Sequence, residues 1–379
     1  MAIQKISDEQ FIAEREAGKT LRQIAQEYGM NIRTVEQRSS NLAKKGHGHG
    51  NKAVAKYVPD GFTVKGTSTM IDAEGNEKIR WVKTSIDNER LEVLMEQARE
   101  AFCSELPKAA PSESPNIDFD ESTLAMYPVF DLHIGAMAHK HECGENYDTA
   151  TAEKVMNGFF DYAVDKAPNS KNAVLVLGGD FLHYDSLEAK TPASGHILDS
   201  DSRYAKIVYV AIRSVRRAIS RMMEKHQVID IKVISGNHDE AGMVWLRAAL
   251  AAFYEDETRV NVDVSPAAMM MTSFGSTLIG YTHGHQMRKA DTRLTVMATD
   301  FRKLFGQSEY VYTHSGHWHS QKITETNLGI DEVHGQLGSP DAYSANGGWR
   351  SQRQAAVIVY HKEFGEVGRF ICRPKMFSQ

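Results

Sequence analysis

The chain has 379 residues, of which 41% are hydrophobic and 25% charged, and this ordinary globular composition allows two or three domains. The formal net charge of −5 excludes nucleic-acid binding through overall charge, so such binding would need local basic patches. The sequence has no apolar run of about 18 residues and no signal-peptide core, which predicts a protein without a membrane span. Its three cysteines form no C-x-x-C pair, which argues against a thiolate zinc site and fits a cytoplasmic protein.

Residues 1–50 have the pattern of short helices. Ser7 and Thr20 each stand three residues before a glutamine, which predicts a capping box at the start of two helices. Gly29 would then supply a left-handed turn, and apolar residues with helical spacing follow it (Ile32, Val35, Leu42). A helix, a glycine turn and a second helix form the helix-turn-helix pattern, so we predict a small all-α, DNA-binding domain here.

The second helix of this pattern and its exit are rich in lysine and arginine. A local excess of cations neutralises nucleic-acid phosphates. The candidate DNA-binding residues are Arg33, Arg38, Lys44 and Lys45. Small basic helical hairpins also contact proteins, so a protein partner is the alternative.

Residues 51–116 are predicted to be a small intermediate region. The segment 57–88 alternates in polarity around Gly75 and predicts a β-hairpin, and a helix is expected at 88–105. The stretch 107–116, PKAAPSESPN, has the composition of a linker.

Residues 117–379 alternate between short apolar runs and segments of helical periodicity. The predicted strands are 124–131, 172–180, 229–239, 276–284, 309–317 and two in the tail at 355–374; the predicted helices are 152–167 and 203–226. No Gly-x-Gly-x-x-Gly opens a helix. The pattern therefore predicts a layered α/β domain rather than a doubly wound nucleotide fold, with its site at the strand ends.

Five short motifs stand at these strand ends: DLHIGA (131–136), GGDFLH (178–183), SGNHDE (235–240), YTHGH (281–285) and SGHWH (315–319). Together they offer seven oxygen or imidazole ligands: Asp131, His133, Asp180, Asn237, His283, His317 and His319. Seven ligands are too many for one ion and suit two ions that share a carboxylate. A mixed carboxylate and imidazole set without cysteine favours manganese, with iron or zinc as alternatives.

Two metals about 3.5–4 Å apart suit phosphoester hydrolysis. A hydroxide held between them is ionised near neutral pH, and the metals neutralise the charge that builds on the phosphate oxygens. His238, next to Asn237, could donate a proton to the leaving alkoxide.

The five motifs, complete and in order, resemble those of the calcineurin-like metallophosphoesterases. This resemblance implies a four-layer αββα sandwich with two metals at the strand ends. It implies one metal bound by Asp131, His133 and His319, a second bound by Asn237, His283 and His317, a bridging Asp180 and a catalytic His238. His285 is an alternative to His283, and His314 is expected to be structural.

Two features favour DNA as the substrate. GGDFLH resembles a stretch of the SbcD-type repair exonucleases in which the extra histidine, here His183, is implied to contact the substrate phosphate, although Phe181 and Leu182 stand in the reverse order. The second feature is the helix-turn-helix pattern. The stretch 343–354 also offers side chains for stacking and phosphate binding, or it is an ordinary turn (Tyr343, Trp349, Arg350, Arg353).

The resulting prediction is a metal-dependent DNA nuclease. Only about sixty residues follow His319, so we do not expect a coiled-coil ATPase partner. A DNA reader placed before a nuclease suggests a stand-alone enzyme of a phage or mobile element. The alternatives are a phosphodiesterase or phosphatase acting on nucleotides or phosphoproteins, and a DNA-binding regulator with a non-catalytic metal site.

Overall fold

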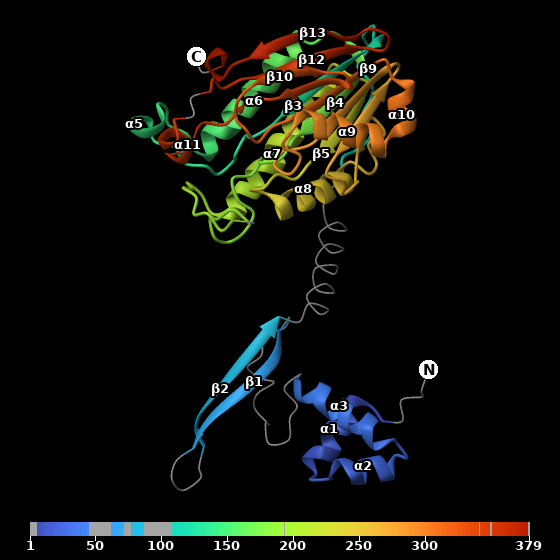
Figure 1. Cartoon of the computed structure of the whole chain (residues 1–379), viewed down its shortest axis with the longest axis vertical. Coiled ribbons are helices and arrows are strands. Elements are labelled where there is room, and N and C mark those ends of the chain that lie inside the picture. The colour runs from blue at the N-terminus through green and yellow to red at the C-terminus, as the bar shows by residue number, and fades with distance from the viewer. Residues whose placement is uncertain are drawn as a thin grey trace. The chain divides into compact units, whose positions relative to one another are not determined.

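The computed structural model describes residues 6–44, 62–71, 77–86 and 108–377, apart from residues 193, 341, 349 and 350 (Figure 1). The chain divides into two compact units, Met1–Glu105 and Leu106–Gln379. The five motifs all lie in the second unit, which therefore holds the candidate site.

The described part of the first unit contains three helices and a two-stranded antiparallel sheet: α1 (Asp8–Glu16), α2 (Leu21–Glu27), α3 (Ile32–Lys44), β1 (Phe62–Ile71) and β2 (Glu77–Ile86). Both predicted capping boxes are present, and Gly29 has a φ of 56°. The helices share a core of Ile6, Phe11, Ile24, Ala25, Val35 and Leu42. The predicted turn at Gly75 and the predicted helix 88–105 lie outside the described residues. The DNA-binding role of this unit stays a prediction.

The larger sheet of the second unit has six strands in the order β13-β12-β3-β4-β5-β6. Its four parallel strands are β3 (Asp120–Val129), β4 (Ser170–Leu177), β5 (Val228–Val233) and β6 (Val260–Val262). The antiparallel strands β12 (Ala355–His361) and β13 (Gly365–Cys372) complete it on the other side of β3.

The smaller sheet has five strands in the order β10-β11-β9-β8-β7. The strands are β7 (Met270–Phe274), β8 (Thr277–Tyr281), β9 (Tyr310–Ser315), β10 (Lys322–Thr326) and β11 (Gly329–Val333). The pairs β8–β9 and β9–β11 are parallel, and the remaining pairs are antiparallel.

The two sheets stack on each other, and helices cover their outer faces. Side chains alternate along β3, so that Leu124 and Met126 pack between the sheets while Tyr127 and Val129 pack on the other face. That face is covered by α6 (Thr149–Lys166), α7 (Tyr204–Met223) and α8 (Glu240–Phe253). On the smaller sheet, α9 (Ala290–Asp300) contributes Leu294 and Met297 to an apolar cluster with β8 and β9, and α10 (Arg302–Gln307) follows it. The α/β prediction is confirmed.

Several elements are not in the sequence-based prediction. They include α8, α9, the edge strands β6, β7 and β10, and three short helices: α5 (Lys140–Cys143), α11 (Ala342–Asn346) and η2 (Pro374–Met376). The strands β6, β7 and β10 are short, with mixed burial, so their pattern does not alternate cleanly. None of the helices in the described part of the chain combines the length and apolarity that a bilayer crossing needs.

The stretch 107–116, predicted as a linker, is bound to the second unit in its described part. The Ala109 N–H donates to the Phe253 carbonyl at 2.7 Å, and the Ser112 N–H donates to Glu257 Oε2 at 2.8 Å. The Arg259 guanidinium donates to Ser112 Oγ and to the Glu113 carbonyl. The composition predicted a spacer, but backbone groups of this stretch form hydrogen bonds with other residues of the second unit.

All five motifs come together because of strand direction. The motifs that contain Asp131, Asp180 and Asn237 follow the parallel strands β3, β4 and β5, whose carboxyl ends lie at one edge of the larger sheet. The motifs that contain His283 and His317 follow β8 and β9, which are parallel in the smaller sheet. The candidate site therefore lies where loops from both sheets meet.

Candidate metal centre

Five of the predicted ligands have left-handed backbone conformations. Within the described residues, the only non-glycine residues with positive φ are Asp131 (51°), His133 (50°), Asp180 (47°), His317 (72°) and His319 (52°). Each such conformation costs a non-glycine residue on the order of 1 kcal/mol or more. Strained residues concentrated at one place are typical of a functional site.

Two glycines allow the loops to approach the carboxylates. A Cβ atom at Gly236 would lie 2.1 Å from Asp180 Oδ1, and one at Gly316 would lie 2.4 Å from Asp131 Oδ2. Both distances are far below van der Waals contact, so these positions need the absence of a side chain. The glycines before Asn237 and His317 thus bring their loops against the two buried aspartates.

The first group of ligands is Asp131, His133 and His319. Asp131 Oδ1 lies 3.4 Å from His319 Nε2, and the Nε2 atoms of His133 and His319 are 3.2 Å apart. Asp131 is fully buried, and its Oδ2 accepts the His317 N–H at 2.9 Å, which orients the carboxylate. One carboxylate oxygen and two imidazole nitrogens therefore converge on one point.

The second group is Asp180, His283 and His317, whose ligand atoms lie within 4.8 Å of one another. Asp180 Oδ2 is 3.2 Å from His283 Nε2. His283 Nδ1 lies 3.0 Å from the Gly178 carbonyl, which can only accept, so Nδ1 carries the proton and Nε2 is directed at Asp180. Burial lowers the pKa of His317 to about 4, which favours the neutral imidazole that a metal requires.

The donor set fits two divalent ions. Ligand atoms about 2.1 Å from an ion lie roughly 3.0–3.5 Å from each other, which agrees with the separations of 3.2–3.4 Å in both groups. Asp131 Oδ1, Asn237 Oδ1 and His283 Nε2 are buried without a hydrogen-bond partner, which is costly unless a cation binds them. Burial acts to lower the pKa of His283, but the charges of Asp180, Asp131 and Asp239 raise it to about 10, a sign of strong negative potential.

His285 lies beside this centre without the same convergence. Its ring centroid is 5.3 Å from that of His283 and 6.1 Å from that of His317. It is His283, rather than His285, whose Nε2 lies next to Asp180 and whose Nδ1 is held by the Gly178 carbonyl. The geometry favours His283 as the ligand of the YTHGH motif.

Asp239 is an important residue that the sequence did not reveal as such. Its buried carboxylate accepts four backbone N–H groups, those of Asp180, Phe181, Leu182 and Gly236. Burial and the nearby charge of Asp180 raise its pKa to about 7 despite these bonds. Asp239 thus joins the loop after β4 to the loop after β5 and positions Asp180. The SGNHDE motif contains this aspartate, but the spacing of the motif does not indicate which backbone N–H groups donate hydrogen bonds to its carboxylate.

His238 and His183 stand beside the first group. His238 Nδ1 lies 2.8 Å from the His183 carbonyl, so Nδ1 is protonated, while Nε2 lies 4.0 Å from Asp180 Oδ2. His183 is buried, and its Nδ1 lies 3.4 Å from His133 Nδ1. Both side chains line the same cavity as the ligands, in reach of a substrate bound there.

The cavity over this centre has a volume of about 790 Å³. The candidate ligands that line it are His133, Asp180, Asn237, His317 and His319. Its remaining walls are rich in hydroxyl groups and include one exposed indole: Thr191, Ser194, His196, Trp318, Ser320, Ser339 and Ser344. The cavity is larger than a phosphoryl group needs and falls in the range of small-molecule sites.

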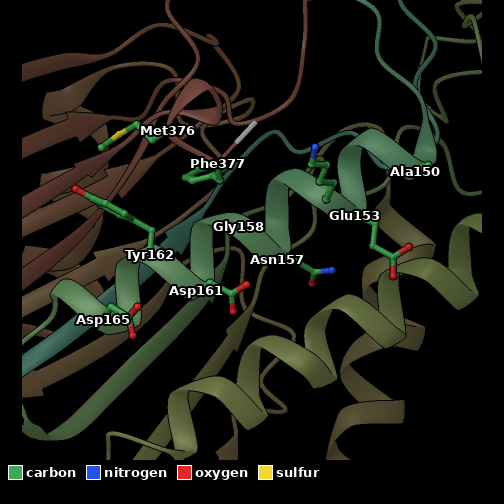
Figure 2. Close-up of a pocket in the computed structure, with 10 residues that line it drawn as sticks. Ala150, Glu153, Asn157, Gly158, Asp161, Tyr162, Asp165, Met376 and Phe377 are labelled. Carbon is green, nitrogen blue, oxygen red and sulfur yellow. The ribbon is translucent and has the colours of Figure 1, made fainter. Parts of the chain in front are cut away.

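A second cavity, of about 560 Å³, lies along α6 and the C-terminal residues Met376 and Phe377 (Figure 2). It contains none of the predicted site residues. Its acidic residues are already paired with α7: Glu153 with Arg213, Asp161 with Arg217, and Asp165 with Arg221. This groove therefore has no comparable set of convergent, unsatisfied ligands.

Two other predicted positions behave as structural residues. His314 is buried between His334 (2.9 Å) and the Tyr360 hydroxyl (2.7 Å), as a structural role requires. Arg353, a candidate for phosphate binding, instead donates to Glu145 and to the Leu337 carbonyl, so that interpretation is wrong. Trp349, Arg350 and the side chain of Tyr343 lie outside the described residues.

The basic residues of the first unit differ from one another. Arg38 donates to Asp8 of α1 and lies over the Phe11 ring, so its guanidinium helps to hold α3 on α1. Arg33 is exposed on α3. The side chain of Lys44 and the whole of Lys45 lie outside the described residues.

Substitution of Gly236 by alanine is expected to lower turnover of a phosphodiester by about 10²-fold, because the new methyl group would displace Asp180. The measurement is kcat with saturating manganese, together with the number of bound ions. Gly306→Ala is the matched control, since a Cβ there meets nothing within 4 Å. Normal metal content and kcat in Gly236→Ala would contradict the placement of Asp180 in the centre.

No protein-family model matches the chain, and no curated protein matches it. Solved structures similar to it include a dimetal phosphatase from Danio rerio (8% identity, TM-score 0.38), which covers 66% of this chain and 99% of its own. An archaeal phosphodiesterase has 13% identity and a TM-score of 0.32, with 66% and 99% covered, and a phosphoesterase from E. coli has 9% and 0.32, with 65% and 98% covered. Similarity at this level does not assign the chain to a family.

Proposed function

We propose that this chain is a metal-dependent phosphodiester hydrolase of the calcineurin-like metallophosphoesterase kind, with DNA as its substrate. The observation that carries the proposal is the pair of convergent ligand groups, of which the second contains Asp180, with His238 beside them on one cavity. A structural metal site would not need a cavity above it or an imidazole that reaches the ligands without belonging to either group.

The residues divide the work as follows. One divalent ion would be held by Asp131, His133 and His319, and the other by Asn237, His283 and His317. Asp180 would bind both ions. When bound, the ions would supply an ionised water nucleophile and neutralise the phosphoryl oxygens. The oxygen of water forms a bond to phosphorus while the bond to the leaving oxygen breaks. His238 Nε2 gives its proton to that leaving oxygen. His183, on the same wall, would donate to a phosphate oxygen.

Manganese is the ion that this donor set favours, with iron and zinc as alternatives. Carboxylate, amide and imidazole donors with no thiolate suit ions of intermediate hardness. Metal analysis of the protein purified without chelators, followed by reconstitution with each ion, would identify the active metal.

The proposal of DNA rests on the first unit and on His183. The exposed Arg33 lies on α3, in the position of the second helix of a helix-turn-helix pattern. A separate DNA-binding unit would raise the local concentration of phosphodiester at the hydrolase site. The ion pair of Arg38 with Asp8 makes Arg33 the better residue for a test.

Arg33→Ala is expected to weaken DNA binding about uniformly across sequences and to reduce the salt slope of binding by about one, because one phosphate contact is lost. Binding is measured by fluorescence anisotropy at several salt concentrations. Arg22→Ala removes an exposed cation from α2 and serves as the charge-matched control. An equal loss in both variants would show a general charge effect and contradict a specific role for α3.

The experiment that tests the function compares four substrates with added manganese: a chromogenic phosphodiester, a chromogenic monoester, and single- and double-stranded DNA. DNA cleavage by the wild-type protein that is absent in Asp180→Asn would establish a nuclease. Cleavage of the small esters alone would indicate a nucleotide or protein phosphatase or phosphodiesterase. Metal binding without hydrolysis of any substrate would favour a DNA-binding regulator.

A further inference from the structure

Trp318 is a large aromatic residue at the mouth of the metal-centre cavity. It stands between the ligands His317 and His319, lines the cavity with them, and is 45% exposed. An aromatic side chain among the polar groups of a cavity offers a flat apolar face to a bound ligand. It is a candidate for contact with the part of the substrate that lies beyond the phosphate.

The backbone fixes Trp318 relative to the metal ligands. His317 and His319 both have left-handed φ values, of 72° and 52°, and the Trp318 N–H donates to the Gly316 carbonyl at 2.9 Å. The indole contacts the His317 ring edge-on, with centroids 5.0 Å apart and planes at 70°. The indole therefore has a defined place next to the His317 ring, and a fixed side chain is what a binding surface requires.

The chemistry of the other walls suits a nucleoside. Thr191, Ser194, Ser339 and Ser344 bring hydroxyl groups to the cavity, and His196 brings an imidazole. Hydroxyls can both donate to and accept from the sugar and the edges of a base. An aromatic face opposite such groups is the combination that recognises a single nucleotide unit, because every base offers a π-face.

We propose that a nucleobase adjacent to the scissile phosphate stacks on Trp318, so that the site selects diesters of nucleosides over simple alkyl or sugar diesters. The inference rests on the proposed phosphodiester hydrolysis and adds a specificity residue to it. Stacking of one base on an aromatic side chain corresponds to a factor of about five to 100 in affinity. Trp318 touches the substrate in this proposal but takes no part in proton transfer.

The test uses thymidylyl-thymidine and two analogues in which the thymine of one or the other nucleoside is replaced by hydrogen. These substrates have the same phosphodiester and the same alkoxide leaving group, so they differ only in the base. The wild-type enzyme with manganese is expected to cleave the dinucleotide at least tenfold faster, in kcat/KM, than one of the two analogues. In Trp318→Ala this ratio falls to near one, mainly through KM, and Trp318→Phe restores part of it.

Trp245→Ala is the matched control, because Trp245 is 36% exposed on α8 and does not line the cavity. The proposal would be overturned if the ratio of kcat/KM between the dinucleotide and the analogue were the same in Trp318→Ala as in the wild type. This includes the case in which the substitution slows all substrates equally. Hydrolysis of bis(p-nitrophenyl) phosphate by the wild type is run alongside. If the wild type cleaves bis(p-nitrophenyl) phosphate but shows no base preference, the role of Trp318 is refuted while the hydrolase function stands. If it does not cleave this diester, the result contradicts the proposed hydrolase function itself.

Discussion

Asp180→Asn is expected to reduce turnover of any phosphodiester by about 10³-fold or more and to lower the metal content from two ions to one or none. The carboxylate lies at the centre of the site: Oδ2 is 3.2 Å from His283 Nε2, and Oδ1 accepts the His238 backbone N–H at 2.9 Å. Asparagine keeps the shape but removes the charge that a shared ligand provides. A loss of about 4 kcal/mol in transition-state stabilisation corresponds to this factor.

Two measurements check the result: kcat at saturating manganese, and bound metal by elemental analysis after dialysis. Asp230→Asn is the control, since that carboxylate accepts a bond from Asn261 and belongs to neither ligand group. Asp180 also attracts cationic groups in the folded protein, so its substitution can change stability as well as metal binding. The thermal stability of the variant is therefore measured without metal, which separates an effect on folding from an effect on function. Two bound ions and near-normal kcat in Asp180→Asn would refute a dinuclear centre built on this residue.

The sequence identified the candidate ligands that the fold brings together, because they stand in short motifs at strand ends. Asp131 and Asp180 follow the parallel strands β3 and β4 within two to three residues, so strand direction brings them to one edge of the larger sheet. His317 follows β9 of the smaller sheet by two residues, and the stacking of the two sheets brings its loop to theirs. The strand β4 is largely buried and is followed by Gly178 and Gly179, and β9 is followed by Gly316, which makes their ends clear in the sequence. Fold class and candidate centre could therefore be predicted together.

Contacts between distant residues could not be predicted in this way. Arg353 pairs with Glu145, 208 residues away in the chain, and this pairing turns an apparent phosphate-binding arginine into a structural one. The same holds for Arg38, whose partner is Asp8. A charged side chain in a sequence has no visible partner, and only the fold determines whether its charge is available.

Trp318 and Asp239 illustrate a second limit. Both stand inside motifs that were recognised, yet one is 45% exposed at the cavity and the other is fully buried under four N–H groups. Period and composition do not distinguish these environments, because loops have no regular alternation. The roles of loop residues thus depend on the backbone geometry that the left-handed ligands impose.

His238→Gln is expected to lower kcat by about 10²–10⁴-fold for a DNA phosphodiester while two metal ions stay bound. The side chain belongs to neither of the two groups described above, although its ring converges with those of His133 and His183 in a third set. The backbone N–H of residue 238 that binds Asp180 is retained in the variant. The proton on Nδ1 is held by the His183 carbonyl, so Nε2 is the atom available to a leaving oxygen. Glutamine can still form a hydrogen bond there but cannot transfer a proton.

The leaving group distinguishes proton donation from simple phosphate binding. An alkoxide such as a deoxyribose oxygen needs a proton as its bond to phosphorus breaks, whereas p-nitrophenoxide leaves as a stable anion. A general acid at residue 238 therefore predicts a large loss for DNA and a small loss for bis(p-nitrophenyl) phosphate. His141→Gln, which changes an exposed imidazole that does not line the cavity, should show no such difference. An equal loss on both substrates would mean that His238 binds the phosphoryl oxygens in the transition state. The leaving oxygen would then have to take its proton from another group in the cavity, and His183, whose ring stacks on that of His238 with centroids 5.6 Å apart, is a candidate.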